Sequence, residues 1–208
     1  MQARLCGVGG TLLTDELDRG ERSARPLDAA SGDRVWVFGY GSLIWRPDFP
    51  FAARKRASVD GWTRRFWQGS HDHRGTPHAP GRVVTLIAEP TARCIGIAYL
   101  VEHDVFDHID HREKNGYTRH DVALAFDDAH AVGVMYVAHP DNEAFLGDAP
   151  LDAIARQILL SRGPSGANVE YLLELARALR DLDADDAHVF ELAARVKSLE
   201  LDGRPPHA

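Results

Sequence analysis

The fold class is decided in residues 131–160, "AVGVMYVAHPDNEAFLGDAPLDAIARQILL", where the sequence pattern changes. Residues 131–138 form a short run rich in Val that is bounded by turn residues, which is typical of a strand. From Leu151 onward, apolar residues recur at spacings of three and four, the period of an amphipathic helix. The chain therefore passes from strands to helices near Pro150.

Elsewhere in the chain, strand-like runs come before this point and helical runs come after it. The other strand-like runs lie at residues 35–38, 82–89, 93–101 and 119–126. The helical runs lie at residues 151–160, 168–182 and 186–200. Because strands precede helices without βαβ alternation, the sequence predicts an α+β domain, a largely antiparallel sheet or barrel with helices packed on one side.

The length of the chain sets the expected number of domains. A chain of 208 residues, 44% of them hydrophobic, can bury about 70% of its unfolded surface in one core. Residues 1–33 are rich in Gly, Ser, Asp and Arg without sustained periodicity, and we expect a mobile or loosely packed lead-in there. Residues 34–208 are expected to form a single domain.

Charge argues against two classes of partner. The formal net charge is −7, whereas nucleic-acid and anionic membrane surfaces are bound mainly by clustered Lys and Arg. Arginines do gather in residues 53–67, but such a run usually forms a solvated strand face. We therefore expect neither nucleic acid nor membrane as a partner. The pattern gives no indication of the oligomeric state.

The expected location is the cytoplasm. Cys6 and Cys94 lie far apart and form no CxxC pair, so neither a disulfide framework nor a zinc ribbon is indicated. The first twenty residues have no signal-peptide pattern. No stretch approaches the roughly 20 apolar residues that a membrane-spanning helix needs.

A glycine-flanked tyrosine follows the first strand-like run. Gly39 and Gly41 bracket Tyr40 and are followed by Ser42 and Leu43. Glycine permits positive φ and close approach, so consecutive N–H groups there could form a nest for a carboxylate. A β-bulge or a sheet corner explains the same spacing. A P-loop and a dinucleotide fingerprint are excluded, because the lysine and the third glycine are missing.

Residues 101–117, "VEHDVFDHIDHREKNGY", predict a short amphipathic helix that ends in a tight turn. Val105, Phe106 and Ile109 would form its buried stripe, and Asn115 or Gly116 would take the left-handed conformation. Glu113 would then stand at a helix end, from where a side chain can reach into a cleft. A Glu beside a Lys is usually a solvated surface pair, so composition alone does not make Glu113 catalytic.

Metal and nucleophile signals are weak. The histidines whose spacing could in principle bind zinc are His71, His73, His78, His108 and His111. No HExxH pattern accompanies them, and Ser42 lies outside any GxSxG elbow. We expect no metal, no cofactor and no protein nucleophile.

Five blocks together resemble the ChaC family of glutathione-specific γ-glutamylcyclotransferases. They occur in the family's order and spacing over about residues 35–200. The blocks are "VFGYGSLIWRPDFPF" (37–51), "WTRRFWQGSHDHRGTPHAPGRVVTL" (62–86), "REKNGY" (112–117), "HPDNEAFLGDAP" (139–150) and "IARQILLSRGPSGANVEYLLELARALR" (154–180).

The resemblance implies a fold and an activity. The fold would be the γ-glutamylcyclotransferase-like one, a small, largely antiparallel β-barrel with flanking C-terminal helices. The activity would be cleavage of glutathione to 5-oxoproline and cysteinylglycine, without a cofactor. A close rival is cyclisation of other γ-glutamyl amino acids or γ-glutamylamines. A non-catalytic sensor of γ-glutamyl peptides would keep the same pocket, and a metal-dependent hydrolase ranks last.

The resemblance also implies site residues. The family's YGSL loop holds the glutamyl group, which assigns substrate binding to Tyr40, Gly41, Ser42 and Leu43, with Gly39 beside them. The glutamate of its REKGGY-like motif maps onto Glu113 as general base and acid. Asn115 stands where the family commonly has glycine, and Asn tolerates the same left-handed geometry.

The remaining contacts stay open at the level of sequence. Arg82 is the proposed partner of the glycine carboxylate of glutathione, with Arg64, Arg65 and Arg74 as equal alternatives. Tyr117 either donates a hydrogen bond in the site or only packs. Asp141 and Asn142 are expected to serve a turn.

Overall fold

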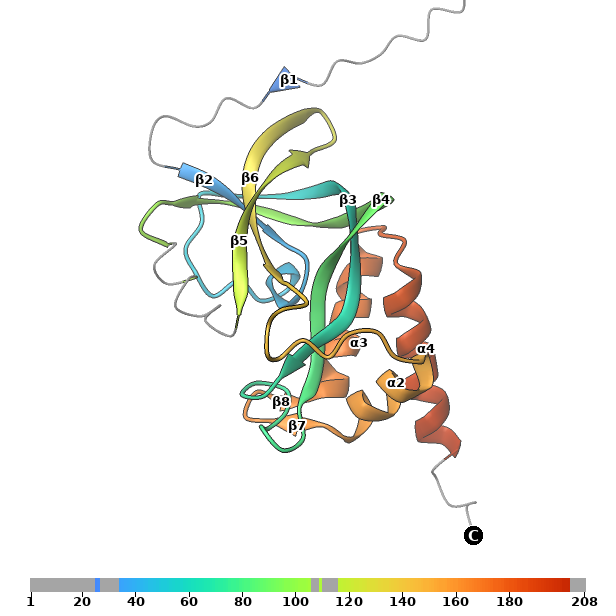
Figure 1. Cartoon of the computed structure of the whole chain (residues 1–208). Coiled ribbons are helices and arrows are strands. Elements are labelled where there is room, and N and C mark those ends of the chain that lie inside the picture. Colours follow the sequence, from blue (N-terminus) through green and yellow to red (C-terminus); the bar gives the residue numbers. More distant parts are fainter. Residues whose placement is uncertain (1–24, 27–33, 106–108, 110–115, 203–208) are drawn as a thin grey trace, which may run out of the picture.

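The computed structural model describes residues 25–26, 34–105, 109 and 116–202, and its centre is a closed barrel of five strands (Figure 1). The barrel strands are β2 (Arg34–Gly39), β3 (Ala53–Ser70), β4 (Gly81–Glu102), β5 (Tyr117–Ala125) and β6 (Ala129–Ala138). They are hydrogen-bonded in the order β6-β2-β4-β3-β5, and β5 pairs back onto β6. This closure confirms the barrel alternative and the α+β class.

The barrel is antiparallel except at one seam. β2 and β6 run parallel and pair Trp36 with Gly133 and Val37 with Val134. A side chain at Gly133 would meet the Trp36 carbonyl oxygen at 2.7 Å and the Leu124 side chain at 2.6 Å. Glycine therefore lets the two strands approach where the barrel closes. The short strand β1 (Arg25–Pro26), within the predicted lead-in, pairs parallel with the start of β6.

β3 and β4 extend beyond the barrel as a long two-stranded arm (Figure 1). The sequence predicted two separate strands at 82–89 and 93–101, but both belong to β4. The gap between the two predicted strands is a register irregularity, because Asp60 pairs with Arg93 whereas Trp62 pairs with Ala88. The residues of β4 between these pairs form a bulge opposite Gly61, and the strand continues through it.

Three helices pack along this arm, on one side of the molecule (Figure 1). They are α2 (Leu151–Leu160), α3 (Asn168–Asp181) and α4 (Ala187–Asp202). Their buried stripes include Ile154 and Ile158 on α2, Leu172 on α3, and Val189 and Leu192 on α4, which confirms the three predicted helices. Among the described residues, no helix is both long and apolar enough to cross a membrane.

Two short elements complete the described chain. The 3-10 helix η1 (Ser42–Ile44) follows β2 directly, and the small hairpin β7 (Arg162–Gly163) and β8 (Gly166–Ala167) lies between α2 and α3. Between α2 and α3, where this hairpin lies, the sequence had indicated only turn residues.

Most of the predicted short helix lies outside the described residues, including Phe106. Val105 and Ile109 are described and buried, as predicted. Gly116 has a φ of +86°, which confirms the left-handed residue expected at Asn115 or Gly116.

Candidate functional site

The loop from Gly39 to Leu43 leaves the barrel at the end of β2 and turns at once into η1. The Ile44 N–H donates to the Gly41 carbonyl oxygen at 3.0 Å and closes the turn. Ile44 is buried, and Leu43 packs partly buried against the core. Tyr99 Oη donates to the Leu43 carbonyl oxygen at 2.6 Å from β4. The apolar residues after the loop therefore fix its backbone to the barrel.

The two glycines of this loop are required for close approach. A Cβ at Gly39 would lie 2.6 Å from the Leu43 Cβ, and a Cβ at Gly41 would lie 2.9 Å from Tyr171 Oη. Neither residue uses the positive φ that glycine permits, since φ of Gly41 is −118° and Gly39 is not among the positive-φ residues. Gly39 also pairs in register with Ile97, which excludes a β-bulge there.

Tyr40 and the loop backbone are held by partners from three strands. The Tyr40 side chain is buried, and its hydroxyl donates to the Tyr136 carbonyl oxygen on β6 at 2.6 Å. The Tyr40 carbonyl oxygen accepts from Arg64 Nε on β3 at 2.6 Å. The guanidinium of Arg64 also donates to the Ile95 carbonyl oxygen on β4 at 2.7 Å.

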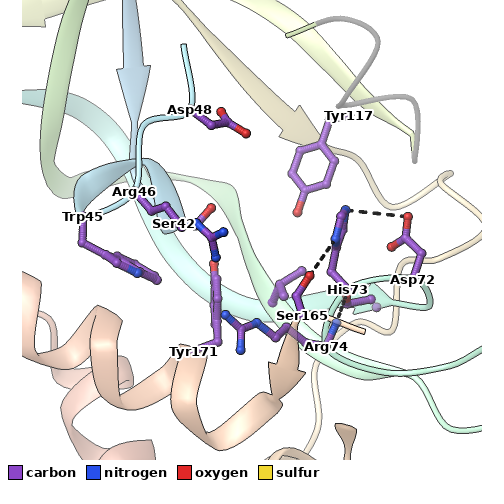
Figure 2. Close-up of a pocket in the computed structure, with 13 residues that line it drawn as sticks. Ser42, Trp45, Arg46, Asp48, Asp72, His73, Arg74, Tyr117, Ser165 and Tyr171 are labelled. Atoms are coloured by element: carbon purple, nitrogen blue, oxygen red, sulfur yellow. Dashed lines mark hydrogen bonds and ion pairs between the residues drawn. The ribbon is translucent and has the colours of Figure 1, made fainter. Parts of the chain in front are cut away.

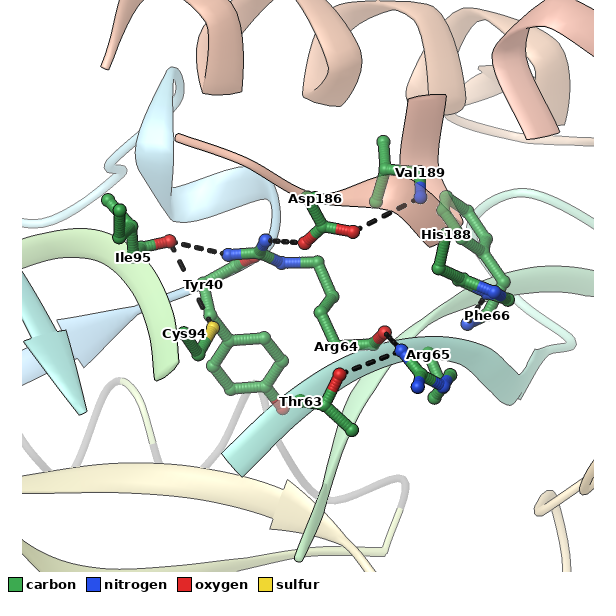
Figure 3. A network of polar contacts seen from close by, with 10 residues as sticks. All are labelled: Tyr40, Thr63, Arg64, Arg65, Phe66, Cys94, Ile95, Asp186, His188 and Val189. Carbon is green, nitrogen blue, oxygen red and sulfur yellow. Dashed lines mark hydrogen bonds and ion pairs between the residues drawn. The ribbon is translucent and has the colours of Figure 1, made fainter. Parts of the chain in front are cut away.

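Arg64 links this loop to helix α4 (Figure 3). Its side chain is 1% exposed and forms an ion pair with Asp186. Asp186 Oδ1 in turn accepts from the Val189 N–H at 3.1 Å in the first turn of α4. Burial raises the pKa of the neighbouring Cys94 thiol to about 11, although Arg64 opposes the shift. Cys94 therefore remains a thiol, and Arg64 supports the loop.

His188 makes a second link between α4 and β3. Its Nε2 accepts from the Phe66 N–H at 3.0 Å. Burial, followed by the charge of Arg65, lowers the pKa of His188 to about 4. The ring is thus neutral at physiological pH, in the state that can accept this hydrogen bond.

Two adjoining cavities open beside the loop. The smaller, of about 80 Å³, is lined by Gly39–Leu43 and by aromatic residues that include Tyr136. The larger, of about 290 Å³, extends towards the turn between β3 and β4 (Figure 2). Both are lined by Ser42, Tyr117 and Tyr171. One molecule could therefore occupy both cavities across these three residues.

The larger cavity carries charges of both signs. Its charged or titratable lining residues are Arg46, Asp48, Asp72, His73, Arg74, Tyr117 and Tyr171. Arg74 Nη1 donates to the Ala167 carbonyl oxygen at 3.1 Å, and the guanidinium lies 5.8 Å from the Tyr171 ring centroid. The Tyr117 hydroxyl donates to the Val84 carbonyl oxygen at 3.0 Å. Tyr117 thus lines the cavity while its hydroxyl is bonded to the main chain of β4, and a hydrogen bond to substrate stays a prediction.

Arg82 lies outside the lining of both cavities. Its guanidinium donates to Gln157 Oε1 at 2.6 Å, to the Phe66 carbonyl oxygen at 2.9 Å and to the Gly147 carbonyl oxygen at 3.1 Å. Burial lowers the pKa of Arg82, while Asp148 opposes the shift. Of the four arginines that the sequence offered, Arg74 lines the larger cavity.

Glu113 lies outside the described residues, but the turn after it is described. Asn142 Nδ2 donates to the Gly116 carbonyl oxygen at 2.8 Å, and Asn142 Oδ1 accepts from the Ala144 N–H at 2.8 Å. Asn142 therefore forms the expected turn and also holds the residue that precedes β5. Asp141 lies in the same turn.

Sequence reasoning missed the residues that other segments contribute to the larger cavity. Trp45 and Asp48 come from the segment that follows η1, Ser165 from the β7–β8 turn, and Tyr171 from α3. Only Ser165 had a local signal, the glycines on either side of it. Within the described parts of the chain, no group of three His, Cys, Asp or Glu side chains is arranged to hold a metal ion.

The barrel, its glycine loop and the two cavities place the chain in a class that solved structures represent. A yeast γ-glutamyl cyclotransferase specific to glutathione is similar in structure, with a TM-score of 0.76 and 31% identity. The similarity covers 80% of this chain and 97% of that one. The γ-glutamylcyclotransferase-like fold is confirmed.

The family follows from the sequence comparisons. The model of the family described as ChaC-like protein matches residues 35–199. γ-Glutamylcyclotransferase 2-3 of Arabidopsis thaliana is 44% identical, covering 79% of this chain and 89% of the relative. Human glutathione-specific γ-glutamylcyclotransferase 1 is 39% identical, covering 84% and 83%. The chain belongs to the ChaC family, and the resemblance is confirmed.

Proposed function

We propose that this protein degrades glutathione by cyclising its γ-glutamyl group, which releases 5-oxoproline and cysteinylglycine. The observation that carries the proposal is its similarity, over most of both chains, to relatives that are named glutathione-specific γ-glutamylcyclotransferases. It acts as a lyase-type enzyme on a small-molecule substrate. The proposed location is the cytoplasm, and the reaction includes no cofactor.

The reaction needs few protein groups because the substrate carries its own nucleophile. The α-amine of the glutamyl group attacks the γ-carbonyl carbon and closes a five-membered ring. Well-oriented intramolecular attack can supply about 7–11 kcal/mol of the barrier reduction. The enzyme has to hold the glutamyl group, move protons and stabilise the oxyanion, so a covalent enzyme intermediate is unnecessary.

The smaller cavity is the proposed site of the glutamyl group. Gly39–Leu43 line it, so main-chain N–H groups and the Ser42 hydroxyl are the proposed donors to the α-carboxylate and the oxyanion. Tyr40 shapes this cavity, since its own hydroxyl is engaged with Tyr136. The loop is already fixed by Arg64 and Tyr99, which limits the reorganisation that binding requires.

The larger cavity is the proposed site of the cysteinylglycine part. It adjoins the smaller one at Ser42, Tyr117 and Tyr171, so a substrate anchored by its glutamyl end would extend into it. Arg74 lines this cavity and Arg82 does not, which favours Arg74 as the partner of the glycine carboxylate. Arg82, which was first assigned to the glycine carboxylate, is instead proposed to support the arm formed by β3 and β4.

Glu113 is the proposed general base and then the general acid. A free glutamate has a pKa near 4.3 and an α-amine one near 8, so proton transfer between them is mismatched by about 5 kcal/mol. Partial burial of a carboxylate raises its pKa and reduces this mismatch. Lys114 would have to point away, because pairing with it would make the base weaker.

The test measures 5-oxoproline and cysteinylglycine released from glutathione by the purified wild type and by Glu113→Gln. We expect equal amounts of the two products from the wild type, and a loss of about 10²–10⁴-fold in the variant. Glu143→Gln, at a glutamate that is exposed, is the control and should keep full activity. Circular dichroism checks folding. An active Glu113→Gln variant would place the base elsewhere.

Substrate breadth is tested in the same assay. If γ-glutamylalanine is turned over as well as glutathione, the specificity part of the proposal fails and the rival substrate class holds. If the wild type releases no 5-oxoproline from either compound, the proposed function fails as a whole.

A further inference from the structure

We propose that His73 is a second proton-transfer residue, which protonates the departing amine of cysteinylglycine. The inference rests on the proposed function and deepens it. It assigns to the larger cavity a catalytic group that neither the glycine loop nor the glutamate motif supplies. In this scheme Glu113 is the base for the attacking amine, and His73 replaces Glu113 as the acid for the amine that leaves.

The backbone of His73 is held in place by the β7–β8 turn. The Ser165 N–H donates to the His73 carbonyl oxygen at 2.9 Å. Gly163 packs so closely that a Cβ there would lie 2.3 Å from the same oxygen. On its own side of the turn, the Arg74 N–H donates to Ser70 Oγ at 3.0 Å. Although His73 lies in a connection between strands, two neighbouring segments fix its position.

The side chain of His73 is held at one edge and faces the cavity (Figure 2). Nδ1 lies 3.2 Å from Ser165 Oγ, and Nε2 lies 3.8 Å from Asp72 Oδ2. When Nδ1–H donates to the serine oxygen, Nε2 is the ring atom that gains and loses the proton. The Asp72 contact becomes an ion pair when the ring is protonated. Ser165 is thus a positioning residue for His73.

The position of His73 agrees with the path of the leaving group. In Figure 2, the His73 ring and the Tyr117 hydroxyl point into the same space. Tyr117 also lines the smaller cavity, where the glutamyl group is placed. The scissile bond then lies near the junction of the two cavities, and its nitrogen lies on the His73 side.

The proton balance of the proposed step is complete. Glu113 takes one proton from the α-ammonium group, and the amine nitrogen, which still carries two hydrogens, forms a bond to the γ-carbonyl carbon. This nitrogen then loses a second proton to solvent and keeps the single hydrogen of the lactam. The C–N bond to cysteine breaks, its electron pair stays on the departing nitrogen, and Nε2–H of the imidazolium supplies the proton with which cysteinylglycine leaves as an amine. The amine takes a further proton from solvent, Glu113 returns its proton to solvent and His73 regains one, so both groups are restored.

A second group has a chemical advantage over a single glutamate. The departing nitrogen cannot leave as an amide anion, so its protonation must accompany bond cleavage. An imidazolium ring can supply this proton and recover it from solvent. The titratable groups that share its cavity wall are Arg46, Asp48, Asp72, Arg74, Tyr117 and Tyr171.

The contrasting interpretation is a solvated histidine in an exposed connection, since the His73 side chain is 58% exposed. His78 provides a matched control for it. His78 belongs to the same connection and is exposed, but it lies outside the lining of both cavities. A general effect of loop substitution would appear equally in both variants.

The experiment compares the wild type, His73→Gln and His78→Gln by 5-oxoproline release from glutathione across a range of pH. We expect His73→Gln to lower kcat by about 10²-fold with little change in KM. The fall of kcat at alkaline pH, which reports loss of the proton from the acid, should disappear in this variant alone. Ser165→Ala should lower kcat less, and Ser165→Thr, which keeps a hydroxyl, should restore it.

The outcomes separate this inference from the proposed function. An active wild type together with a folded His73→Gln variant of unchanged kcat and pH profile overturns the role of His73 and leaves the proposed function intact. A raised KM with unchanged kcat also overturns it, because His73 would then only bind substrate. A wild type that releases no 5-oxoproline overturns both.

Discussion

At the scale of single residues, Gly41 is the glycine of the glutamyl cavity whose side-chain space is taken by a residue of the facing wall. Its φ of −118° is open to any amino acid, so the requirement comes from space. A Cβ would meet Tyr171 Oη at 2.9 Å and Val84 Cγ2 at 3.1 Å. Because Tyr171 lines both cavities, a side chain at position 41 would displace the loop or the wall that faces it.

We therefore expect Gly41→Val to lower kcat/KM for glutathione while the protein stays folded. A displacement of about 1 Å in a positioning group can cost about 10²-fold, and most of the loss should appear as a raised KM. Steady-state kinetics of 5-oxoproline release measures it. An unchanged KM in the valine variant would contradict the assignment of the loop to substrate binding.

A double-mutant cycle identifies the crowding contact. Gly41→Ala places a single methyl group against the Tyr171 hydroxyl, and Tyr171→Phe removes that hydroxyl. Residues in direct contact show non-additive effects, so we expect the double variant to be more active than the product of the two single effects. Strictly additive losses would mean that the methyl group acts elsewhere.

At the scale of elements, the glycine loop depends on helix α4, which begins far away in sequence. The Arg64–Asp186 pair joins β3 to the first turn of α4, while Arg64 Nε holds the Tyr40 carbonyl oxygen. Asp186 has two functions, since its other oxygen caps the helix at Val189. A change at the N-terminus of α4 should therefore alter the position of the Gly39–Leu43 loop.

Asp186→Asn separates these two functions. Asparagine is a good N-cap, so α4 should keep its first turn, but the buried guanidinium of Arg64 loses its counter-charge. Removing one partner of a buried pair costs about 3–5 kcal/mol, and we expect the free energy of unfolding to fall by an amount of that order. Urea denaturation measures it. The control is Asp60→Asn, at the exposed pair with Arg93, which should leave the free energy of unfolding unchanged.

At the scale of the whole molecule, the sequence predicted single helices and strands better than the contacts that join them. The periodicity of residues 151–160 and 168–182 was enough for α2 and α3, because an amphipathic stripe is a local property. The merging of two runs into β4 was missed, since a bulge around Pro90 and a strand end have similar local sequences. The closing β2–β6 seam depends on contacts between Trp36 and Gly133, which no local pattern contains.

The candidate site shows the same limit. The Gly39–Leu43 loop could be singled out because its residues are consecutive. The larger cavity joins Ser42 to Ser165 and Tyr171, and their proximity exists only after α3 has packed along the arm. Arg82 and Arg74 stood as equal candidates, because local sequence does not show which arginine will line a cavity once the chain has folded.

The link between α4 and the arm also makes stability depend on pH. The pKa of His188 is about 4 in the folded protein, mainly through burial, and near 6.5 in an unfolded chain. Between these values the unfolded chain binds a proton that the folded protein does not, so the free energy of unfolding falls as pH falls through this window. Above about pH 6.5 both states are neutral, and this contribution to stability is complete.

We expect His188→Gln to weaken this pH dependence, because Gln Oε1 can still accept from the Phe66 N–H but does not titrate. The wild type should lose up to about 3 kcal/mol more than the variant between pH 7 and pH 4. Urea denaturation of both proteins at several pH values measures the difference, and His120, whose pKa burial also lowers, is common to both and cancels. His130→Gln, at an exposed histidine, should follow the wild type. Parallel curves for wild type and His188→Gln would mean that folding does not lower the pKa of His188, and α4 would then be held to the arm mainly by the Arg64–Asp186 pair.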